Sequence, residues 1–583
     1  MNLNFLGRVS RLAAIGAILL GSASCVKVDA TLGENFIPTD QIWNVFTPEA
    51  VVLEDVMLHT SDSLSAYSTS RFTFGAITDG QGTSIKSTSF TLVPFADTID
   101  FGKNPKVKRF HFTAAKDTVS TYNGIQEKML QNVYVTALKQ PLDSNILFIG
   151  DFSGEKGAKN REAYLTEQLI TSGIPIYNGG DSLSFEFSRE FTEELIRKLD
   201  GMVLDSLDTY LKAFPGIYIT TDTPSGLGGR INMFELGIST DSYNYIQGNY
   251  AELQYTAEYD YSDEPVDTSL IFYFGPGEIM EPGANDFPSQ FAFNASDNAE
   301  SLEKYGKGVK ATDKIYIEGG IGAKPVVKAT EIKAIVEKLV ADAGISDISE
   351  VVINKATIIL PYNVGGDFDA LDKYPDVLSP TVKLKSSDGK YVSFAGLTDS
   401  SIETENQGNI NRSLNMYCPD ISHHVQEILK LKKKDGESDA DFEKRIESYD
   451  IWFLIMHEEI TVTDNSGAYD DYYNNLLYNS YYNNMMYDPY GYGYGYGGYG
   501  GYGGYGGYGG YGGYGGYGYN NYYNYMMMAA MAGSYNQTSE KSTVELDKDR
   551  YYRCTLNGPE YDGTLEELPR LKVTFSAPKS AEN

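Results

Sequence analysis

A series of short segments in which apolar and polar residues alternate constrains this chain more than any other feature. Alternation with a period of two buries one face of a strand and leaves the other in water. Gly, Asp, Asn and Ser separate the segments, which are rich in Tyr, Thr, Val, Ile and Phe, as in antiparallel sheets joined by turns. The pattern therefore predicts a mainly β protein. Representative predicted strands are Val51–His59, Arg71–Ile77, Val107–Thr113, Ala251–Tyr259, Ile353–Pro361, Trp452–His457, Arg550–Leu556 and Leu571–Ser576.

The strand-rich segments fall into two halves, separated by a stretch from Pro276 to Pro288 that is rich in Pro, Gly and acidic residues. Such stretches between patterned segments are typical of loops and domain boundaries. We expect two tandem antiparallel β-sandwich domains of jelly-roll-like form, over residues 50–275 and 289–583, with a few crossover helices.

Three segments have the apolar spacing of amphipathic helices. Thr192 is a candidate N-cap for the first, whose apolar residues recur every three or four positions to Leu211. The second begins at Thr330, and Gly344 is its expected terminator. The third lies near Ser422–Lys432. We expect each helix to pack its apolar stripe against a sheet.

The first residues of the chain resemble an export signal. Arg8 and Arg11 form a positive region, and Leu12–Gly21 is an apolar stretch too short to span a bilayer. We therefore expect residues 1–24 to be a cleaved signal peptide.

The small residues that follow the apolar stretch end at Cys25, an order similar to the bacterial lipobox. Ser22 stands where that motif usually has Leu. We expect Cys25 to carry lipid and residues 25–49 to form the tether, because two or three acyl chains anchor a protein stably without a spanning helix. An ordinary signal peptide with an incidental cysteine is the alternative.

The charge balance limits the partners of the chain. Its 583 residues include 47 Lys and Arg against 79 Asp and Glu, which gives a formal net charge of −32. An acidic chain lacks the clustered cations that nucleic acid requires, and charge does not attract it to an anionic bilayer. Three cysteines are too few for a disulfide scaffold or a cysteine-rich metal site.

A segment of low complexity interrupts the second half between about residues 466 and 540. Gly-Gly-Tyr triplets run from Gly497 to Tyr517, without charge or branched aliphatic residues. Glycine raises the entropy cost of ordering, so we expect a long disordered Tyr/Gly loop inserted between the strands Trp452–Val462 and Arg550–Leu556. A tyrosine surface that binds glycans or proteins and a tolerated repeat expansion are the two interpretations of this loop.

Motifs that would mark an active site are missing from the sequence. It contains no phosphate-binding loop, no dinucleotide fingerprint and no nucleophile elbow. His423 and His424 are adjacent on a predicted helix and face different ways, so with Asp420 they make a weak metal site at best. We expect no enzyme activity, no cofactor and no metal.

Cys418 and Cys554 are the thiols that remain besides Cys25. In an oxidising envelope they are candidates for a disulfide bond. Small buried residues without a bond are the other interpretation, and the sequence does not give the geometry that would decide.

Several short motifs after Cys25 resemble a known family when taken in order. They are Leu32–Pro38, Phe214–Ile219, Ile315–Gly320, Ile353–Pro361 and Pro569–Phe575. The series is similar to the uncharacterised Bacteroidota lipoproteins grouped as the domain of unknown function 4270 family, and it covers nearly the whole mature chain. The resemblance implies an outer-membrane lipoprotein, on the cell surface or the periplasmic face, and supplies no catalytic residues. The last two motifs also look like jelly-roll modules that bind polysaccharide, which is a likeness of fold alone.

Asp-Ser/Thr-apolar triplets resemble the O-glycosylation acceptor of envelope proteins in the same bacterial group. The candidate acceptors are Ser63, Thr98, Thr118, Ser182 and Ser206, of which Ser206 is the poorest because it lies within a predicted helix. Chance matches are expected in a chain this rich in Asp and Ser.

Two functions from different classes remain. The first is a non-catalytic outer-membrane lipoprotein that acts as a binding or scaffold module for envelope proteins or glycans. The second is an envelope polysaccharide hydrolase, which would need two carboxylates about 5–10 Å apart in a cleft. We favour the first, because it explains the anchor, the predicted sandwiches and the missing motifs.

Overall fold

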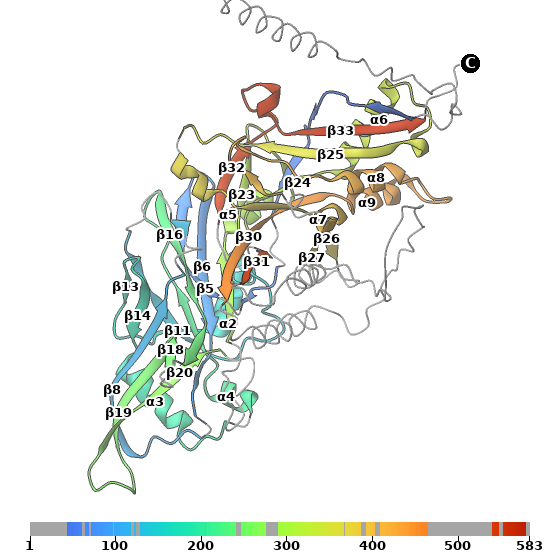
Figure 1. Ribbon diagram of the computed structural model, residues 1–583. Helices are drawn as coiled ribbons and strands as arrows, with labels where there is room; N and C mark the ends of the chain where they lie inside the picture. The colour runs from blue at the N-terminus through green and yellow to red at the C-terminus, as the bar shows by residue number, and fades with distance from the viewer. Residues whose placement is uncertain are drawn as a thin grey trace, which may run out of the picture.

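The computed structural model is mainly β, with several antiparallel sheets, which confirms the fold class expected from the alternating segments (Figure 1). It describes residues 43–578 apart from 61–63, 69–70, 97, 118–121, 124–128, 205, 241–245, 276–289, 367, 386–391, 403–407, 464–538 and 547–551. None of the helices in this part of the chain combines the length and the apolar composition needed to cross a bilayer.

Two sheets are built mainly from the first half of the chain. The larger has nine strands, in the order β12-β11-β15-β6-β5-β16-β9, with β21 paired to β6 and β4 paired to β21. They are β4 (Tyr67–Ser68), β5 (Arg71–Asp79), β6 (Gly82–Phe90), β9 (Tyr122–Asn123), β11 (Tyr134–Leu138), β12 (Leu165–Leu169), β15 (Ile217–Thr220), β16 (Gly228–Glu235) and β21 (Ala292–Asp297). The other has five strands in the order β14 (Ser182–Glu186), β8 (Lys103–Ala115), β19 (Tyr250–Glu258), β20 (Val266–Phe274) and β7 (Leu92–Pro94).

Two further sheets contain most of the second half. One is ordered β1 (Trp43–Phe46), β33 (Arg570–Pro578), β25 (Val352–Pro361), β29 (Met416–Tyr417) and β28 (Ile410–Asn411), with β2 (Val51–Val52) beside β33. The other is ordered β22 (Val309–Lys310), β3 (Val56–His59), β24 (Lys324–Val327), β30 (Ile451–Thr463), β26 (Val377–Lys385) and β27 (Val392–Gly396), with β31 (Ser539–Leu546) beside β30. The five-stranded sheet and the sheet with β33 lie at opposite ends of the molecule (Figure 1).

Three small two-stranded sheets complete the described β structure. They pair β10 (Gln131–Asn132) with β13 (Ile176–Tyr177), β17 (Ile238–Thr240) with β18 (Ile246–Gly248), and β23 (Lys314–Glu318) with β32 (Arg553–Asn557). The last pair joins segments far apart in the sequence, so it can form only after the chain has returned from the long insertion.

β19 shows why the alternating segments become strands. Ala251, Leu253, Tyr255 and Ala257 are buried, while the residues between them are partly exposed. The strand lies between β8 and β20, so both of its edges are hydrogen-bonded and only its two faces differ. Burying a leucine or tyrosine side chain contributes about 2 kcal/mol, which fixes the register because a slip of one residue would expose the whole apolar set.

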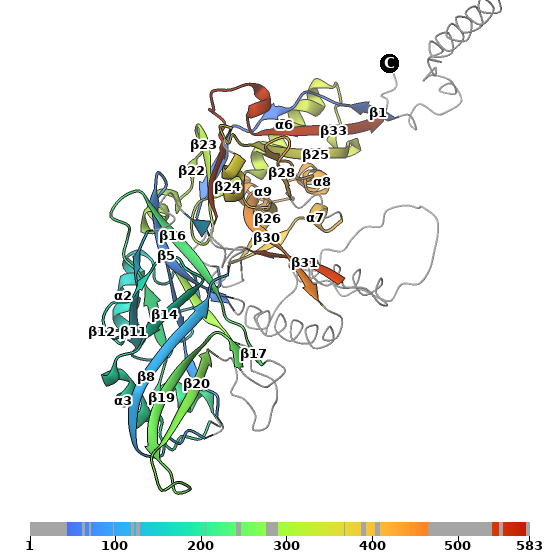
Figure 2. The same cartoon turned by 60° about the vertical axis from the view of Figure 1, so that its left-hand side comes forward.

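The two halves exchange strands (Figure 2). β1, β2 and β3 come from the start of the described chain but pair with β33 and β24 of the second half. In the opposite direction β21, which follows the predicted boundary, pairs with β6. One buried cluster contains residues of both halves, including Ile149, Phe293 and Trp452. The division of the chain at residues 276–288 stays a prediction, but the sheets on either side of it share strands.

Eight α-helices lie in the described part of the chain: α2 (Gly154–Tyr164), α3 (Arg189–Leu199), α4 (Leu207–Ala213), α5 (Ala299–Tyr305), α6 (Ala329–Asp342), α7 (Thr398–Ile402), α8 (Ser422–Lys430) and α9 (Asp439–Glu447). The helices expected at Thr330 and Ser422 are present as α6 and α8. Gly344 follows α6 with a φ of 78°, the left-handed conformation expected of a terminator. Residues of both helices pack in the core under β25 and β33.

The first predicted helix was placed correctly but given the wrong bounds. Ser188, not Thr192, is the N-cap, because its hydroxyl accepts the backbone N–H of Phe191. The apolar stripe does not continue as one helix to Leu211, since Gly201, with a φ of 75°, follows the end of α3 and separates it from α4.

β30 and β31 bracket the Tyr/Gly segment. They pair antiparallel from Met456, opposite Leu546, to Thr463, opposite Ser539, at the end where the segment leaves and returns. The returning strand was expected at Arg550–Leu556, but β32 in that region pairs with β23 instead. The segment itself lies outside the described residues, and its last two predicted positions, Ser539 and Glu540, belong to β31.

Candidate functional site

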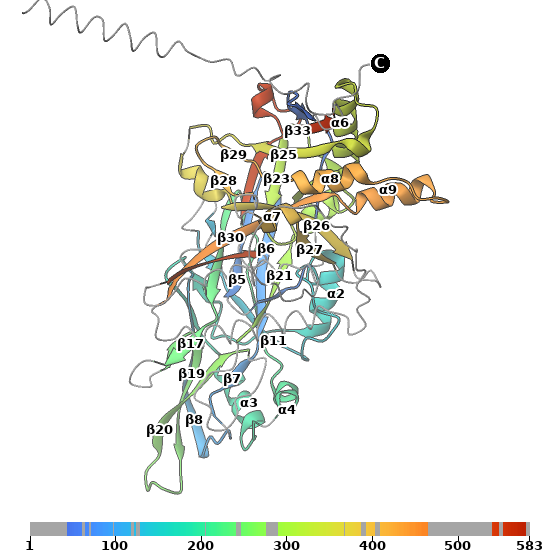
Figure 3. The same cartoon turned by 45° about the vertical axis from the view of Figure 1, so that its right-hand side comes forward.

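A polar pocket of about 540 Å³ lies on the side of β25 that faces away from the core, next to the short strands β28 and β29. These three strands lie at the same end of the molecule as α8 (Figure 3). The lining residues are Lys355, Thr357, Asn409, Ile410, Asn411, Arg412, Ser413, Cys418 and Asp420.

β25 supplies one wall of the pocket through its alternation. Ala356 and Ile358 point into the hydrophobic core, so Lys355 and Thr357 on the same strand point outward. The opposite wall is the turn between β28 and β29, which is tied to the sheet because Leu360 pairs with Tyr417 in β29. Two backbone segments that are held by a common core therefore fix the distance across the pocket.

Two cations and one carboxylate determine the charge of the lining. Lys355 is exposed on β25, and Arg412 donates from Nη2 to Asp376 at 3.1 Å. Asp420 accepts the backbone N–H of Ser422 at 2.9 Å and also the hydroxyl of Ser422. These contacts orient Arg412 and Asp420, so the pocket presents a positive and a negative group in defined places.

Cys418 is the half-buried thiol of the pocket. Burial raises its pKa, and the charges of Lys355 and Arg570 act in the opposite direction. A thiol with a raised pKa is a weak nucleophile, so Cys418 is suited to lining the pocket rather than to covalent catalysis.

The two cysteines considered for a disulfide are both free in this structure. Cys554 is buried in β32, where burial raises its pKa strongly. Cys418 is half-buried at the pocket. Their pairing stays a prediction.

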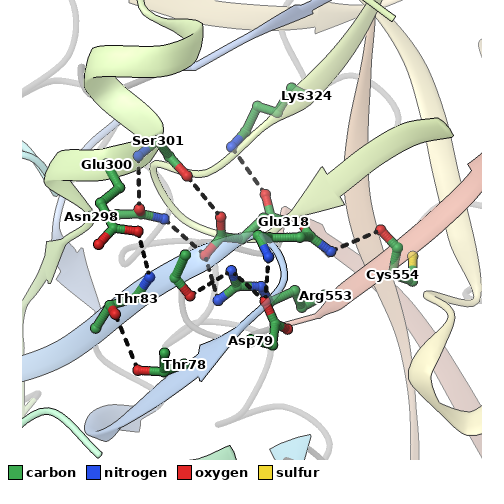
Figure 4. A network of polar contacts seen from close by, with 12 residues as sticks. Thr78, Asp79, Thr83, Asn298, Glu300, Ser301, Glu318, Lys324, Arg553 and Cys554 are labelled. Atoms are coloured by element: carbon green, nitrogen blue, oxygen red, sulfur yellow. Dashed lines mark hydrogen bonds and ion pairs between the residues drawn. The ribbon is translucent and has the colours of Figure 1, made fainter. Parts of the chain in front are cut away.

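A second polar cluster is closed rather than open, and it joins the two halves of the molecule (Figure 4). Arg553 of β32 and Glu318 of β23 are each 1% exposed, and the nearest Nη1 and Oε1 atoms are 3.7 Å apart. Nη2 of Arg553 is 2.8 Å from Oδ1 of Asp79 and donates to the carbonyl of Gly82, both at the β5–β6 turn. The pKa of Asp79 is raised by burial, against the lowering effect of Arg553.

The remaining groups of this cluster donate hydrogen bonds to the carboxylate of Glu318 and to the carbonyl groups of the loop that follows it. Asn298 donates to Oε1 of Glu318 at 2.8 Å, and Ser301 donates to Oε2 at 3.3 Å. The buried ammonium of Lys324 donates to the carbonyls of Glu318, Gly320 and Gly322. Charges matched in this way in a closed interface hold strands together, so we assign this cluster a structural role.

The adjacent histidines do not meet at a common site. His424 is buried, its Nε2 lies 2.8 Å from the carbonyl oxygen of Tyr449, and burial lowers its pKa to about 4. His423 is exposed beside Glu427. Asp420 points to Ser422 instead of either ring. Within the residues that the structure describes, no group of three His, Cys, Asp or Glu side chains could hold a metal ion.

The candidate attachment sites fall in different places. Cys25, Ser63 and Thr118 lie outside the described residues. Thr98 and Ser182 are exposed, the latter on the edge strand β14, so both are accessible to a modifying enzyme.

Ser206 lies at the N-cap position of α4, just before the helix instead of within it. It is partly buried. The expectation that Ser206 lies within a helix is therefore wrong, but its lower exposure makes it a poorer acceptor than Thr98 or Ser182.

The pocket is the functional candidate that sequence reasoning missed. Lys355 and Thr357 lie in the segment Ile353–Pro361, which was noted for its resemblance, and Cys418 was considered only for a disulfide. No sequence pattern marked Asn409 or Arg412 as pocket residues, because their segment reaches the pocket wall only when β29 pairs with β25.

Comparisons with known proteins add no relative: no family model, no curated protein and no solved structure matches this chain.

Proposed function

We propose that the chain is a non-catalytic outer-membrane lipoprotein that acts as a binding or scaffold module for an envelope glycan or protein. The observation that carries the proposal is the pocket beside β25. Its lining offers amides, hydroxyls and two cations, which recognise a polar ligand by hydrogen bonds and charge.

The alternative, an envelope polysaccharide hydrolase, fits this pocket less well. Hydrolysis requires one carboxyl as acid and another as base or nucleophile, about 5–10 Å apart. Asp420 is the one carboxylate among the residues that line the pocket, and Ser422 already occupies its Oδ1. Two positive side chains would also hold the pKa of a catalytic acid down, so that it would not keep its proton at neutral pH.

The proposed anchor is lipid on Cys25, and the start of the described chain suits a place near a membrane. In β1, Trp43 is 46% and Val45 is 65% exposed, and Val352 on the same face is 44% exposed. Exposed apolar side chains gathered at one edge mark contact surfaces. The proposed site is the outer membrane, on its surface or its periplasmic face.

The proposed architecture is a pair of tandem antiparallel β-sandwiches of jelly-roll-like form. Phenylalanines from the nine-stranded and the five-stranded sheets share one core, with Phe90 of β6 stacked on Phe274 of β20 at 4.7 Å between ring centroids. This shared core supports a sandwich in the first half. The resemblance to the domain of unknown function 4270 family supports the lipoprotein address.

Purification from native membranes tests the binding proposal. Wild-type protein should recover an outer-membrane protein or a cell-surface glycan, and purified protein should cleave no member of a polysaccharide panel. Cleavage that a single Asp or Glu substitution abolishes would establish the hydrolase instead.

The anchor is tested separately by cell fractionation. Cys25→Ala should move the protein from the membrane to the soluble envelope fraction. A variant that stays in the membrane to the same extent as wild type would rule out lipid on Cys25 as the anchor.

A further inference from the structure

We propose that the pocket beside β25 binds a saccharide that carries a carboxylate, such as a uronic acid unit of an envelope glycan. The inference rests on the proposed binding function and names the ligand class of the same site. It follows from the charge of the lining, from its neutral hydrogen-bonding groups and from its size.

The lining contains one cation that forms no ion pair within the described part of the chain. Lys355 and Arg412 line the pocket with Asp420, and Arg412 is paired with Asp376, so Lys355 is this cation, in a protein whose formal net charge is −32. The buried Arg570 lies close enough to lower the pKa of Cys418, so it adds positive potential at the pocket wall. An unpaired cation in a concave site attracts an anionic group locally, although the molecule as a whole repels anions.

The two cations of the lining are of the types that bind a carboxylate. Arg412 is fixed through Nη2 by Asp376, so its planar guanidinium is held in place before a ligand arrives. Lys355 projects from a strand whose neighbouring residues, Ala356 and Ile358, are anchored in the core. A carboxylate between an arginine and a lysine forms charge-assisted hydrogen bonds, which are about twice as strong as neutral ones.

The rest of the lining suits sugar hydroxyls. Asn409 and Asn411 carry amide donors and acceptors, and Thr357 and Ser413 carry hydroxyls. Asp420 uses Oδ1 for Ser422, and its Oδ2 accepts no hydrogen bond from the described part of the chain. A carboxylate acceptor in the pocket repels a small anion but binds a hydroxyl, so the site discriminates an acidic sugar from a simple anion.

The size of the pocket is that of a small-molecule site. Its volume of about 540 Å³ falls within the range of about 300–1,000 Å³ that is usual for ligand pockets. It can therefore hold one or two sugar units, with the rest of a glycan chain in solvent.

Cys418 provides a reporter inside the pocket. It is half-buried in the lining, whereas Cys554 is buried and its pKa is strongly raised. In the full mature chain with Cys25→Ser, a thiol reagent such as a maleimide should therefore react first with Cys418. A ligand that fills the pocket should slow this reaction.

The experiment measures the labelling rate of Cys418 with glucuronate, galacturonate, glucose or inorganic phosphate at equal ionic strength. We expect the two uronates to slow labelling in a saturable way, and glucose and phosphate to leave it unchanged. Mass spectrometry of the labelled peptide verifies that Cys418 is the thiol that reacts. Equal protection by phosphate would overturn the saccharide assignment, and equal protection by glucose would overturn the requirement for a carboxylate.

Matched variants test the role of the pocket cation. Lys355→Gln should weaken uronate protection about tenfold, the loss expected for one charge-assisted hydrogen bond. Lys572→Gln is the control, because it removes the same charge from a residue that does not line the pocket. Lys572 lies on β33, opposite Thr357. Equal effects of the two variants, or no effect of Lys355→Gln, would overturn the proposal.

The ligand assignment and the proposed function can be tested separately, because one can be wrong while the other is right. If no uronate protects Cys418 but membranes still yield a partner of the wild-type protein, the ligand assignment is wrong and the binding function stands. If the uronates protect Cys418 and the purified protein also cleaves their polymers, the ligand class holds and the non-catalytic function is wrong.

Discussion

At the scale of single residues, stability depends on charges buried where strands of the two halves meet. Arg553 is such a charge: it contacts Glu318 on its own side and Asp79 on the other. Glu318 is almost fully buried and Asp79 is mostly buried, so the loss of Arg553 removes a cation that both carboxylates contact.

Arg553→Leu should therefore lower the free energy of unfolding by about 3–5 kcal/mol, measured by urea denaturation. Lys103→Ala is the control, since Lys103 pairs with Asp260 in an exposed ion pair and should leave the denaturation midpoint unchanged. Equal midpoints for the two variants would mean that the Arg553 cluster contributes nothing to the junction of the halves.

Asp450, which follows α9 and contacts the start of α6, and His424 of α8 affect the pH dependence of stability with opposite sign. Burial raises the pKa of Asp450, which accepts the N–H of Ala329 at 2.8 Å, to about 6. The folded protein therefore binds the carboxyl proton of Asp450 more tightly than the unfolded chain does. For this reason the free energy of unfolding falls as the pH rises through about 6, where the folded carboxyl loses its proton. His424, with its pKa lowered to about 4, loses its stabilising effect as the pH falls from 6.5 toward 4. In the wild-type protein the two effects partly cancel, so a plot of stability against pH does not show either group by itself.

Asp450→Asn keeps an acceptor for Ala329 and removes the charge. We expect it to raise the free energy of unfolding at pH 7.5, by at most about 3 kcal/mol, because about two pKa units are released. The difference from wild type should fall below about 1 kcal/mol near pH 4, where Asp450 is protonated in the folded state and about half protonated in the unfolded chain. Urea midpoints at the two pH values test this, since the contribution of His424 cancels in the difference. A variant less stable than wild type at pH 7.5 would show that the charge stabilises α6 more than its burial costs.

At the scale of elements, close contact of strands imposes requirements that only glycine meets. Gly75 of β5 has a φ of 140°, and a Cβ there would lie 2.1 Å from the carbonyl oxygen of Arg230 on β16. Backbone atoms cannot move aside as a flexible side chain can, so the strands must separate.

Gly75→Ala should therefore lower the free energy of unfolding by more than about 2 kcal/mol. Gly80→Ala, in the turn after the same strand, is a matched control because a Cβ there meets no atom within 4 Å. Thermal melts of both variants check the expectation. Similar melting temperatures would show that β5 and β16 adjust without cost.

The alternating pattern predicted most strands because burial on one face leaves a local signal in the sequence. β19 is an example along its length and β25 is another from Ala356 to Leu360, with every second residue buried. Helix α9 was missed because Ile446 is its one buried residue, which gives no stripe. The strand expected after the Tyr/Gly segment, in the region of β32, pairs with β23 and not with β30, because pairing between distant strands depends on contacts that a local pattern does not contain.

The pocket was beyond prediction for the same reason. Lys355 can be placed on the outer face of a strand from the sequence, but Arg412 reaches the site only through the pairing of β29 with β25. The turn between β28 and β29, which includes Asn415, has the polar sequence of an ordinary surface loop. Its place in the pocket becomes evident only when the pairing of β29 with β25 is known.

At the scale of the whole molecule, the start of the described chain completes sheets of the second half. β1 and β2 lie beside β33, and β3 lies beside β24. The sheet that contains β1 therefore also contains β33, the last described strand, and it lies at the end of the molecule opposite β8 and β19 (Figure 1). If Cys25 holds the protein to a membrane, that unit is the nearer one.

Deletion of Gly491–Tyr519 should leave this arrangement intact. The pairing of β30 with β31 does not include these residues, and the entropy of closing a loop changes slowly with its length. We expect a melting temperature within a few degrees of wild type. A fall of more than about 8 °C, equivalent to over about 2 kcal/mol, would show that the segment contributes to the folded structure.

The pairing of Thr463 with Ser539 also has a consequence at the level of the gene. Each Gly-Gly-Tyr unit is encoded by nine nucleotides, so slippage of the DNA polymerase within the repeat adds or removes whole units without a frameshift. Because the two strands meet where the segment leaves and returns, such changes do not move the positions it must connect. We therefore expect alleles of this gene to differ in the number of repeats more than in any other feature, as the sequencing of natural isolates would reveal.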